Sequence, residues 1–181
     1  MGRLFTAVDI SEDVRERLGR FLAKVQPLAN LRWTSAANLH VTTKFIGEWP
    51  KQRSAELERV LTAMPKAGSL MIRIRGLGWF PNPHSPRVFW AGVEAFEGLK
   101  SLAAETSRAV ETLGIPAEAR EYSPHLTLGR TRENTPKESL QAVRQVVAAL
   151  ESDDFGEFEA AAQFLYLSSG GTYTILAQYN L

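Results

Sequence analysis

The chain repeats one order of predicted elements, and this repeat restricts the folds that are open to it. The first copy starts with the strand-like run RLFTAV at residues 3–8 and reaches LRWTSAANLHVTT at residues 31–43 after a helix. The second copy starts with RVFWAGV at residues 87–93 and reaches AREYSPHLTLGRT at residues 119–131, again after a helix. We therefore expect two similar halves, each with a histidine-bearing strand at the same place.

Each half also contains two amphipathic helices. In the first half, a helix over residues 11–25 is capped by Ser11, and another follows Pro50. In the second half, one helix ends at Gly114, and the next is predicted to open with a capping box from Thr135 to Glu138, with Pro136 in its first position. The apolar stripes of the four helices are Val14, Leu18, Phe21, Leu22 and Val25; Leu57, Val60, Leu61 and Met64; Leu99, Leu102, Ala109, Val110 and Leu113; and Leu140, Val143, Val146, Val147 and Leu150.

The order of elements is strand, helix, strand with histidine, helix and strand, twice over. A further strand follows a hairpin turn at Gly170-Gly171. This order favours α+β or α/β architecture in two similar lobes that share an interface. We expect a single domain over residues 1–181, made of repeats at about 1–83 and 84–181, with the PNPHSP loop at 81–86 as their junction.

Composition excludes several classes of function. The net charge is +1, so a polyanionic ligand must be held by a local cluster of cations rather than by an overall basic field. The chain has no cysteine, which excludes disulfides, thiol nucleophiles and thiolate zinc sites. The N-terminal apolar run is too short for a signal peptide, and no segment is apolar over the length that spans a bilayer. We expect a soluble, cytoplasmic protein.

A His-x-Thr motif occurs once in each half, at residues 40–42 and at residues 125–127. Residues two apart on a strand point to the same face. Each motif therefore presents one imidazole and one hydroxyl together, while Val41 and Leu126 point the other way into a core. Two lobes that face each other would bring both motifs into one cleft.

This set of groups suits phosphoryl chemistry without a metal. His40 and His125, one neutral and one protonated, can act as general base and general acid near neutral pH. The hydroxyls of Thr42 and Thr127 can donate hydrogen bonds to phosphate oxygens as charge develops on them. The sequence has no carboxylate and histidine cluster to bind a metal, and no GxxxxGK[ST] loop to support hydrolysis of nucleoside triphosphates.

Polar residues beside the motifs have both functional and structural interpretations. Lys44 shares the predicted face of His40 and Thr42, so it either neutralises phosphate or reaches solvent. Arg130 is either a phosphate ligand, redirected by a kink at Gly129, or an ordinary cation at the end of a strand.

Other residues carry weaker signals. His84 lies among prolines and is interpreted as a loop residue. Val41 and Phe45 are expected to anchor the first motif strand in the core, and Thr43 has no evident role. Five further aromatic residues offer either base stacking or core packing, namely Trp33, Trp49, Trp79, Phe80 and Tyr122.

At these residues the chain resembles the 2H phosphoesterase superfamily, in particular the RNA 2′,3′-cyclic phosphodiesterases that are also called 2′-5′ RNA ligases (LigT-like, ThpR). The segments that carry the resemblance span the whole chain: RLFTAVDI, LRWTSAANLHVTTKFIGEW, GLGWFP, RVFWAGV, PHLTLGR and LYLSSGGTYTIL. The resemblance implies a bilobal α+β fold with pseudo-twofold symmetry, in which each lobe has a sheet with antiparallel strands and two helices, and an active cleft between the lobes.

The resemblance also implies a reaction. His40 would protonate the departing 3′ oxygen of an RNA 2′,3′-cyclic phosphate and His125 would activate water, although the sequence permits the opposite assignment. Thr42, Thr127 and Arg130 would hold the phosphate. The implied enzyme is a monomer without a metal or other cofactor that acts on RNA ends or small nucleotides, and it also joins RNA ends by a 2′-5′ bond without ATP.

Two departures from the family pattern stand out. Thr43 occupies a position that is usually apolar, and Leu167 stands before Ser168 where an acidic or polar residue is usual, so no role is assigned to Ser168. Two other functions stay open: a phosphodiesterase for 2′-5′ oligonucleotides, and an RNA- or nucleotide-binding module without turnover. Retention of both histidines argues against the binding module, because binding alone does not require two imidazoles.

Overall fold

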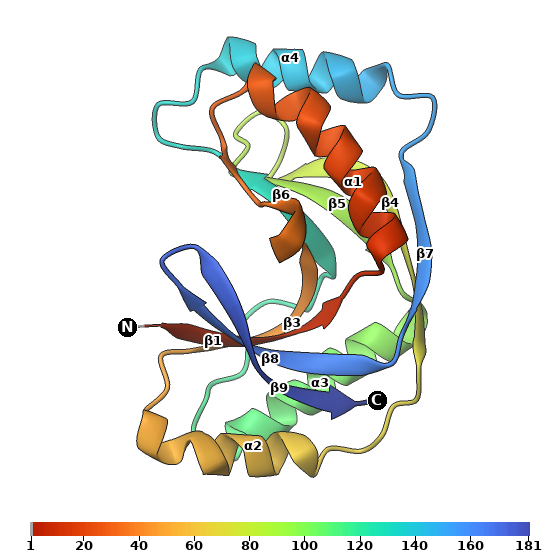
Figure 1. Ribbon diagram of the computed structural model, residues 1–181. Coiled ribbons are helices and arrows are strands. Elements are labelled where there is room, and N and C mark those ends of the chain that lie inside the picture. The colour runs from red at the N-terminus through yellow and green to blue at the C-terminus, as the bar shows by residue number, and fades with distance from the viewer. Residues whose placement is uncertain (1) are drawn as a thin grey trace.

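The computed structural model describes residues 2–181, and these form two antiparallel sheets (Figure 1). One sheet has four strands, in the order β3 (His40–Gly47), β1 (Arg3–Asp9), β8 (Ala162–Ser169) and β9 (Thr172–Asn180). The other has five, in the order β2 (Arg32–Trp33), β6 (His125–Arg130), β5 (Val88–Glu94), β4 (Leu70–Phe80) and β7 (Asp154–Ala160). Each motif histidine is thus the first residue of its strand, one in each sheet.

Two helices accompany each sheet, so the molecule has two lobes. Helices α2 (Ser54–Thr62) and α3 (Phe96–Glu111) lie in the lobe of the four-stranded sheet, where α3 contacts β3 and α2 contacts β9. Helices α1 (Glu12–Val25) and α4 (Lys137–Ala148) lie in the other lobe, where α1 contacts β7 (Figure 1). The predicted bilobal α+β architecture, with two helices and an antiparallel sheet in each lobe, is confirmed.

The lobes do not coincide with the two halves of the sequence. The four-stranded sheet pairs β1 of the first half with β8 of the second, and the five-stranded sheet pairs β2 of the first half with β6 of the second. The PNPHSP loop connects β4 to β5, which are neighbours in one sheet, so it is not a junction between lobes. Likewise, the segment read as one strand before the last hairpin consists of β7 and β8 in different sheets, with Ala161 between them.

The predicted apolar stripes form much of the core. In α1 all five stripe residues are buried, and the Ser11 hydroxyl accepts a hydrogen bond from the backbone N–H of Val14, which confirms the cap. The prediction of a capping box at the start of the last helix is wrong. Its first residue, Thr135, lies outside α4 and its hydroxyl accepts from the backbone N–H of Arg132 instead. The final hairpin is confirmed, because Gly170 and Gly171 both have positive φ, as a two-residue turn of this type requires.

The first motif strand carries a β-bulge directly after its threonine. Thr42 pairs with Ala7 of β1. The next pair joins Lys44 to Thr6, so Thr43 is the extra residue. A bulge places two residues opposite one and reverses the alternation of faces beyond it. As a result Thr43 and Lys44 are both buried, and Phe45 is exposed.

The second motif strand has a bulge at the equivalent place. Thr127 pairs with Trp90 of β5. The next pair joins Gly129 to Phe89, so Leu128 is the extra residue. Leu128 and Gly129 are buried and the following residue is exposed, in the same order as in β3. The internal repeat therefore extends from the sequence to the irregularity of the backbone.

In residues 2–181 no helix has the length and apolar character that spanning a membrane demands.

Candidate active site

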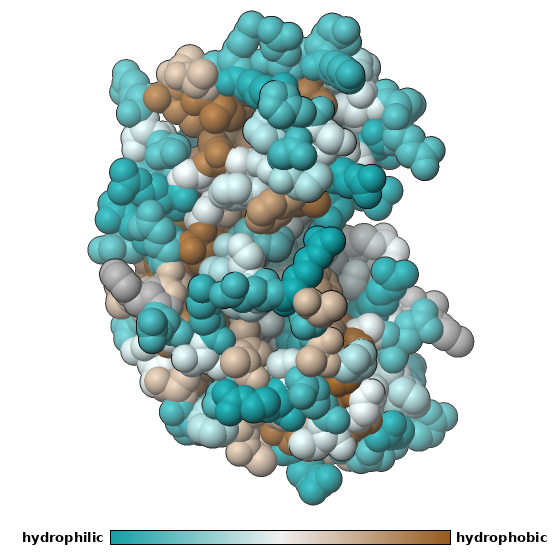
Figure 2. Space-filling view, turned by 180° about the vertical axis from the view of Figure 1, so that it is seen from behind, coloured by the Kyte–Doolittle hydropathy of each residue, from teal (hydrophilic) through white to brown (hydrophobic). Residues whose placement is uncertain are grey.

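The two motif strands meet at a cleft between the lobes. Tyr122 precedes the second motif and β6. Its hydroxyl donates a 2.8 Å hydrogen bond to the backbone carbonyl of Thr42 in β3 and so connects the two strands. A cavity of about 730 Å³ opens beside them, lined by Thr42 and His125 among others. Figure 2 shows the surface hollowed between the two lobes. The structure thus brings together the motifs that stand 85 residues apart in the chain.

Both motif histidines are held in the same tautomer. Nδ1 of His40 lies 2.7 Å from the backbone carbonyl of Asn38, and Nδ1 of His125 lies 2.9 Å from that of Ser123. A carbonyl only accepts hydrogen bonds, so each Nδ1 carries a proton and donates it. Nε2 is then the atom of each ring that can accept or release a proton. In both motifs the partner carbonyl belongs to the residue two positions before the histidine.

The surroundings of the two imidazoles differ. His40 lies against three aromatic rings, with centroid distances of 4.9 Å to Phe5, 5.4 Å to Tyr173 and 6.1 Å to Tyr166. One ring approaches His125 similarly, that of Phe80 at 5.2 Å, within the described residues. Nε2 of His40 also lies 3.0 Å from the hydroxyl of Thr42 in its own motif.

Burial lowers the pKa of His40 from its ordinary value of 6.5. The carbonyl of Asn38 and the carboxylate of Asp9 act in the opposite direction, whereas the positive charges of Arg15 and His125 lower the pKa further. In the free protein His40 is therefore mainly neutral at pH 7, and an anion in the cleft would favour its protonated form.

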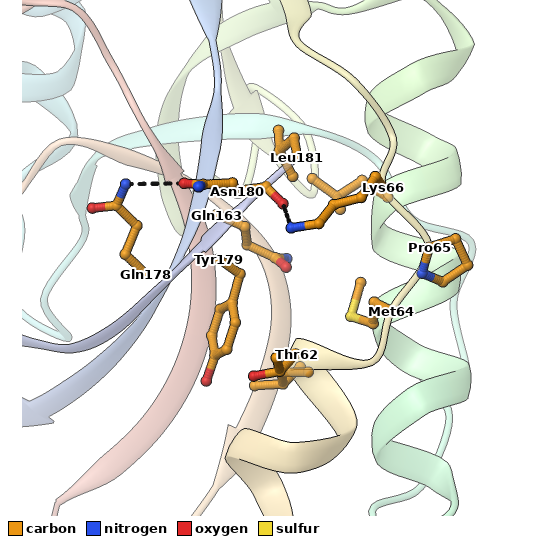
Figure 3. Close-up of a pocket in the computed structure, with 11 residues that line it drawn as sticks. Thr62, Met64, Pro65, Lys66, Gln163, Gln178, Tyr179, Asn180 and Leu181 are labelled. Atoms are coloured by element: carbon orange, nitrogen blue, oxygen red, sulfur yellow. Dashed lines mark hydrogen bonds between the residues drawn. The ribbon is translucent and has the colours of Figure 1, made fainter.

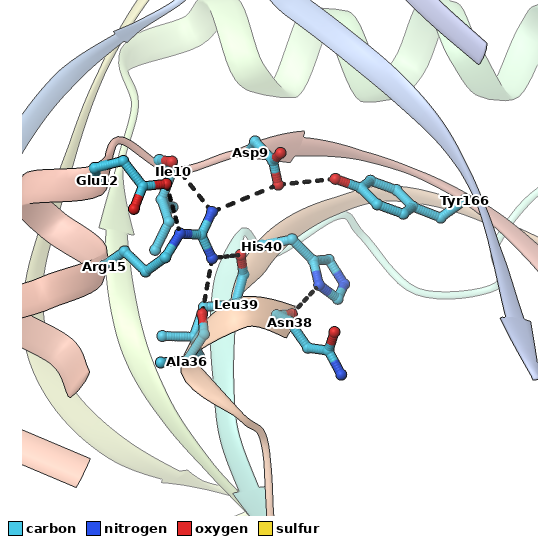
Figure 4. Close-up of polar contacts among 9 residues, drawn as sticks. All are labelled: Asp9, Ile10, Glu12, Arg15, Ala36, Asn38, Leu39, His40 and Tyr166. Carbon is cyan, nitrogen blue, oxygen red and sulfur yellow. Dashed lines mark hydrogen bonds and ion pairs between the residues drawn. The ribbon is translucent and has the colours of Figure 1, made fainter. Parts of the chain in front are cut away.

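A charged network stands behind His40 (Figure 4). Asp9, the strand partner of His40 in β1, accepts a 2.8 Å hydrogen bond from the Tyr166 hydroxyl. The guanidinium of Arg15 lies 3.9 Å from Asp9. It donates to the carbonyls of Ala36 and Leu39, which precede β3, and to that of Ile10, which follows β1. Arg15 thus connects α1 to the turn that leads into the motif strand.

The bulge corrects the predicted orientation of Lys44. Simple alternation places it on the face of His40, but its side chain is only 2% exposed and its ammonium donates to the backbone carbonyl of Pro116 at 2.8 Å. Glu118 lies 3.5 Å from the same ammonium. Lys44 also lines the cleft cavity, and its assignment as a phosphate contact remains a prediction.

Thr43 is explained by a buried chain of hydrogen bonds. Its hydroxyl lies 2.7 Å from that of Thr6 and accepts from Nε2 of Gln163 at 2.6 Å. Nε2 of Gln163 also donates to the hydroxyl of Thr106 at 3.0 Å, and Thr106 donates to the carbonyl of Leu102 in its own helix. Thr43 is polar because it joins β3 to β8 and α3 in the interior.

The prediction that Phe45 is a core anchor is wrong. Its side chain is 59% exposed, and it lines the cleft cavity with Phe80, Tyr122 and Arg87. The same bulge is the cause, since it returns Phe45 to the face of Thr42. Simple alternation of faces along the strand did not predict that Phe45 joins Phe80 and Tyr122 in lining the cleft. The polar Thr43 at an otherwise apolar position was the available sign of an irregular strand.

The remaining predicted residues are placed as follows. Thr127 is half-buried on β6, and Arg130 at the end of β6 is exposed and pairs with Val88, which lines the cleft cavity. His84 lies outside this cavity in the loop between β4 and β5. Ser168 pairs with Arg3, at the end of β1 remote from His40. The substrate-binding role of Arg130 stays a prediction.

A smaller cavity of about 180 Å³ lies in the four-stranded lobe, between α2, α3 and β9 (Figure 3). It is lined by Tyr179, Asn180 and residues that follow α2, and Lys66 closes part of it by donating a 2.8 Å hydrogen bond to the carbonyl of Asn180. Neither motif contributes to its lining. It is therefore not part of the candidate active site.

The chain belongs to the LigT-like phosphoesterase family, whose model matches residues 8–90 and 93–163. It is similar along most of its length to proteins named RNA 2′,3′-cyclic phosphodiesterase. That of Methanocaldococcus jannaschii is 31% identical, with 98% of this chain and 99% of the relative covered. That of Thermus thermophilus is 33% identical, with coverage of 99% and 90%. That of Archaeoglobus fulgidus is 32% identical, with coverage of 87% and 85%.

Solved structures have the same fold. The structure of TT0787 of Thermus thermophilus superposes with a TM-score of 0.80 at 30% identity, covering 99% of this chain and 97% of that one. Escherichia coli LigT complexed with ATP superposes with a TM-score of 0.75 at 26% identity and the same coverage of this chain, with 98% of the LigT chain covered. The predicted resemblance to the 2H phosphoesterases is confirmed.

Proposed function

We propose that this protein hydrolyses the 2′,3′-cyclic phosphate at the 3′ end of RNA to a 2′-phosphate, by acid–base catalysis with His40 and His125. The observation that carries the proposal is the equivalent arrangement of two imidazoles, each with Nδ1 occupied by a backbone carbonyl, in motifs whose Thr42 and His125 line one cleft. The activity named for relatives that match nearly the full length of the chain supports the same reaction.

The proposed reaction needs one proton removed and one supplied. Nε2 of neutral His125 takes a proton from water as the water oxygen bonds to phosphorus. The bond from phosphorus to the 3′ oxygen breaks, and Nε2–H of protonated His40 gives its proton to that oxygen. The products are a 3′-hydroxyl and a 2′-phosphate, and proton exchange with solvent restores both histidines.

The low pKa of His40 in the free protein is compatible with its role as the acid only if substrate raises it. A cyclic phosphate carries one negative charge, and its position beside Nε2 favours the imidazolium. The hydroxyls of Thr42 and Thr127, with the guanidinium of Arg130, are proposed to donate to the phosphate oxygens as they gain charge. Phe45 and Phe80 are proposed to receive the terminal base, because every base has a face that stacks on an aromatic ring.

The first experiment identifies the product and the need for metal. RNA that ends in a 2′,3′-cyclic phosphate is incubated with the protein in EDTA, and the end group is determined. We expect a 2′-phosphate, and a loss of about 10²–10⁴-fold in kcat for His40→Ala and for His125→Ala. Activity that EDTA abolishes, or that survives both substitutions, contradicts the mechanism.

A second experiment assigns the acid and the base. A substrate in which sulfur replaces the bridging 3′ oxygen has a leaving group that needs no proton. We expect this substrate to restore much of the activity of His40→Ala and none of that of His125→Ala. The opposite pattern would exchange the two roles and leave the reaction unchanged.

Joining of RNA ends by a 2′-5′ bond follows from the same groups, with a 5′-hydroxyl of RNA in place of water. Two other functions compete with hydrolysis of cyclic ends: cleavage of 2′-5′ oligonucleotides, and binding without turnover. Product analysis separates them, because a 2′-5′ oligonucleotide would be shortened in the first case and RNA would be recovered unchanged in the second. We further propose that the protein acts as a monomer.

A further inference from the structure

A further cavity of about 400 Å³ lies beside the cleft, and the charged residues that line it are all cations. It is bounded by the loop between β4 and β5, by the segment from β6 to α4, and by one face of α4, which lie together at one end of the molecule (Figure 1). Its charged or titratable lining residues are His84, Arg132, Lys137 and Arg144. No acidic residue lines it in the part of the chain that the structure describes. The protein as a whole has a net charge of only +1, so this local excess of positive charge is not a property of the whole surface.

The cations of this cavity are not neutralised by carboxylates. Among the ion pairs of residues 2–181, none includes Arg132, Lys137 or Arg144. Arg144 is fixed by its surroundings, because one guanidinium nitrogen donates to the carbonyl of Pro83 and the group lies 5.9 Å from the ring centroid of Trp79. Its Nε is buried without a hydrogen-bond partner.

This cavity adjoins the candidate active site. Ser85 lines both cavities, and two residues further along the chain Arg87 lines the cleft. An RNA strand that ends in a 2′,3′-cyclic phosphate can continue only through the 5′ oxygen of its last nucleotide. A strand with its end at the histidines therefore needs a path away from the cleft. Cations that no carboxylate neutralises are suited to bind the phosphodiesters of this strand.

We propose that this cavity binds a backbone phosphate of RNA on the 5′ side of the terminal nucleotide, so that the enzyme prefers RNA strands to cyclic mononucleotides. The inference rests on the proposed function, since it takes the strand end to be at His40 and His125. Arg132 and Lys137 are exposed and contribute charge, and Arg144 contributes a fixed guanidinium at the back of the cavity.

The test compares two substrates, uridine 2′,3′-cyclic phosphate and a short oligouridylate with the same end. The variant is the double substitution Arg132→Gln/Lys137→Gln, since neither side chain makes a side-chain hydrogen bond within the described residues that would hold the fold together. We expect kcat/KM for the oligonucleotide to fall about tenfold or more, and that for the mononucleotide to change less than about twofold. The slope of log(kcat/KM) against log[salt] for the oligonucleotide should become shallower by about 0.7, the value for one lost phosphate contact on a single strand.

The matched control is Lys51→Gln/Arg59→Gln, which removes the same charge from exposed positions in the opposite lobe. It should leave the oligonucleotide kinetics as in the wild type. An equal loss on both substrates, an equal loss in the control, or no loss in the cavity variant would overturn the inference.

A failure of the proposed function is distinguishable from a failure of this inference. If the wild type cleaves neither substrate, the proposed hydrolysis is wrong. Binding of a fluorescent oligouridylate that ends in a 3′-phosphate, followed by anisotropy, then tests the cavity alone. Weaker binding and a shallower salt slope in the cavity variant, but not in the control, support it, and equal binding refutes it.

Discussion

Thr43→Val should destabilise the protein measurably, although it changes only one buried hydroxyl to a methyl group. Thr43, Thr6 and Gln163 are each at most 4% exposed, so water cannot replace the hydrogen bonds that are lost. The substitution leaves the Thr6 hydroxyl without a partner, and Gln163 keeps only its contact with Thr106. A buried polar group without a partner costs about 1–3 kcal/mol.

The expected loss is about 3 kcal/mol in the free energy of unfolding. This sums an orphaned hydroxyl and a partly orphaned amide, less the small gain from burying a methyl group. For a chain of this size the loss corresponds to a fall of about 6–12 °C in Tm. The measurement is urea unfolding followed by circular dichroism, with the exposed strand residue Thr174→Val as the matched control, which should change stability by less than about 0.5 kcal/mol.

A double-mutant cycle sharpens the test. Replacing Thr6 and Thr43 together by valine removes both hydroxyls, and replacement of both partners by apolar groups of similar shape costs much less than loss of one. The double variant should therefore be more stable than the sum of the two single variants predicts. A loss below about 1 kcal/mol for Thr43→Val, or additive losses in the cycle, would refute the role of this hydrogen-bonded chain.

Three further outcomes are expected. Phe45→Ala should raise KM for cyclic-phosphate substrates by about 5–100-fold, because a stacked base contributes about 1–3 kcal/mol. It should leave Tm unchanged, because the ring is exposed. The control is Leu176→Ala, also at an exposed position, and an unchanged KM in Phe45→Ala counts against base stacking. In an NMR titration His40 should have a pKa below 6.5, and Asp9→Asn should lower it further while Glu12→Gln does not, since only the Asp9 carboxylate is among the groups that raise it. His40 is protonated at a higher pH in the unfolded chain than in the folded protein, so the free energy of unfolding should fall as the pH drops below about 6.5. This fall should be smaller in His40→Gln. An identical pH dependence in the variant would show that His40 does not contribute to the pH dependence of stability.

Local patterns predicted the elements and the pair of motifs, because both depend on short-range geometry. The stripe of α1 and its Ser11 cap follow from helical periodicity, and the recurrence of the motif at matching positions agrees with Thr42 of one copy and His125 of the other lining one cleft. The pairing of β1 with β8, and of β2 with β6, joins segments far apart in the chain. No periodicity within a strand encodes which distant strand will be its neighbour, so the lobes were wrongly equated with the halves.

The bulges account for the errors within the site. Strict alternation from Thr42 predicts that Lys44 is on the face of His40 and that Phe45 is in the core, whereas one extra residue at Thr43 leaves Lys44 buried and Phe45 exposed. In the second motif the same error has little consequence, because Gly129 stands at the position of Lys44. A comparison of the two copies held the only clue: Thr43 in one corresponds to Leu128 in the other, and a polar residue in the interior needs hydrogen-bond partners.

The two motifs share a backbone, but their chemistry differs because of what covers them. Each has a histidine tied to a carbonyl two residues earlier, a threonine and a bulge. Over His40, however, β8 and β9 contribute Tyr166 and Tyr173, and this burial is the main cause of its lowered pKa. Strand β9 lies next to β8 at the edge of its sheet, as β7 lies next to β4 in the other sheet. The proposed mechanism needs one imidazole protonated while the other is neutral, and Tyr166 and Tyr173 beside His40 make the surroundings of the two imidazoles unequal.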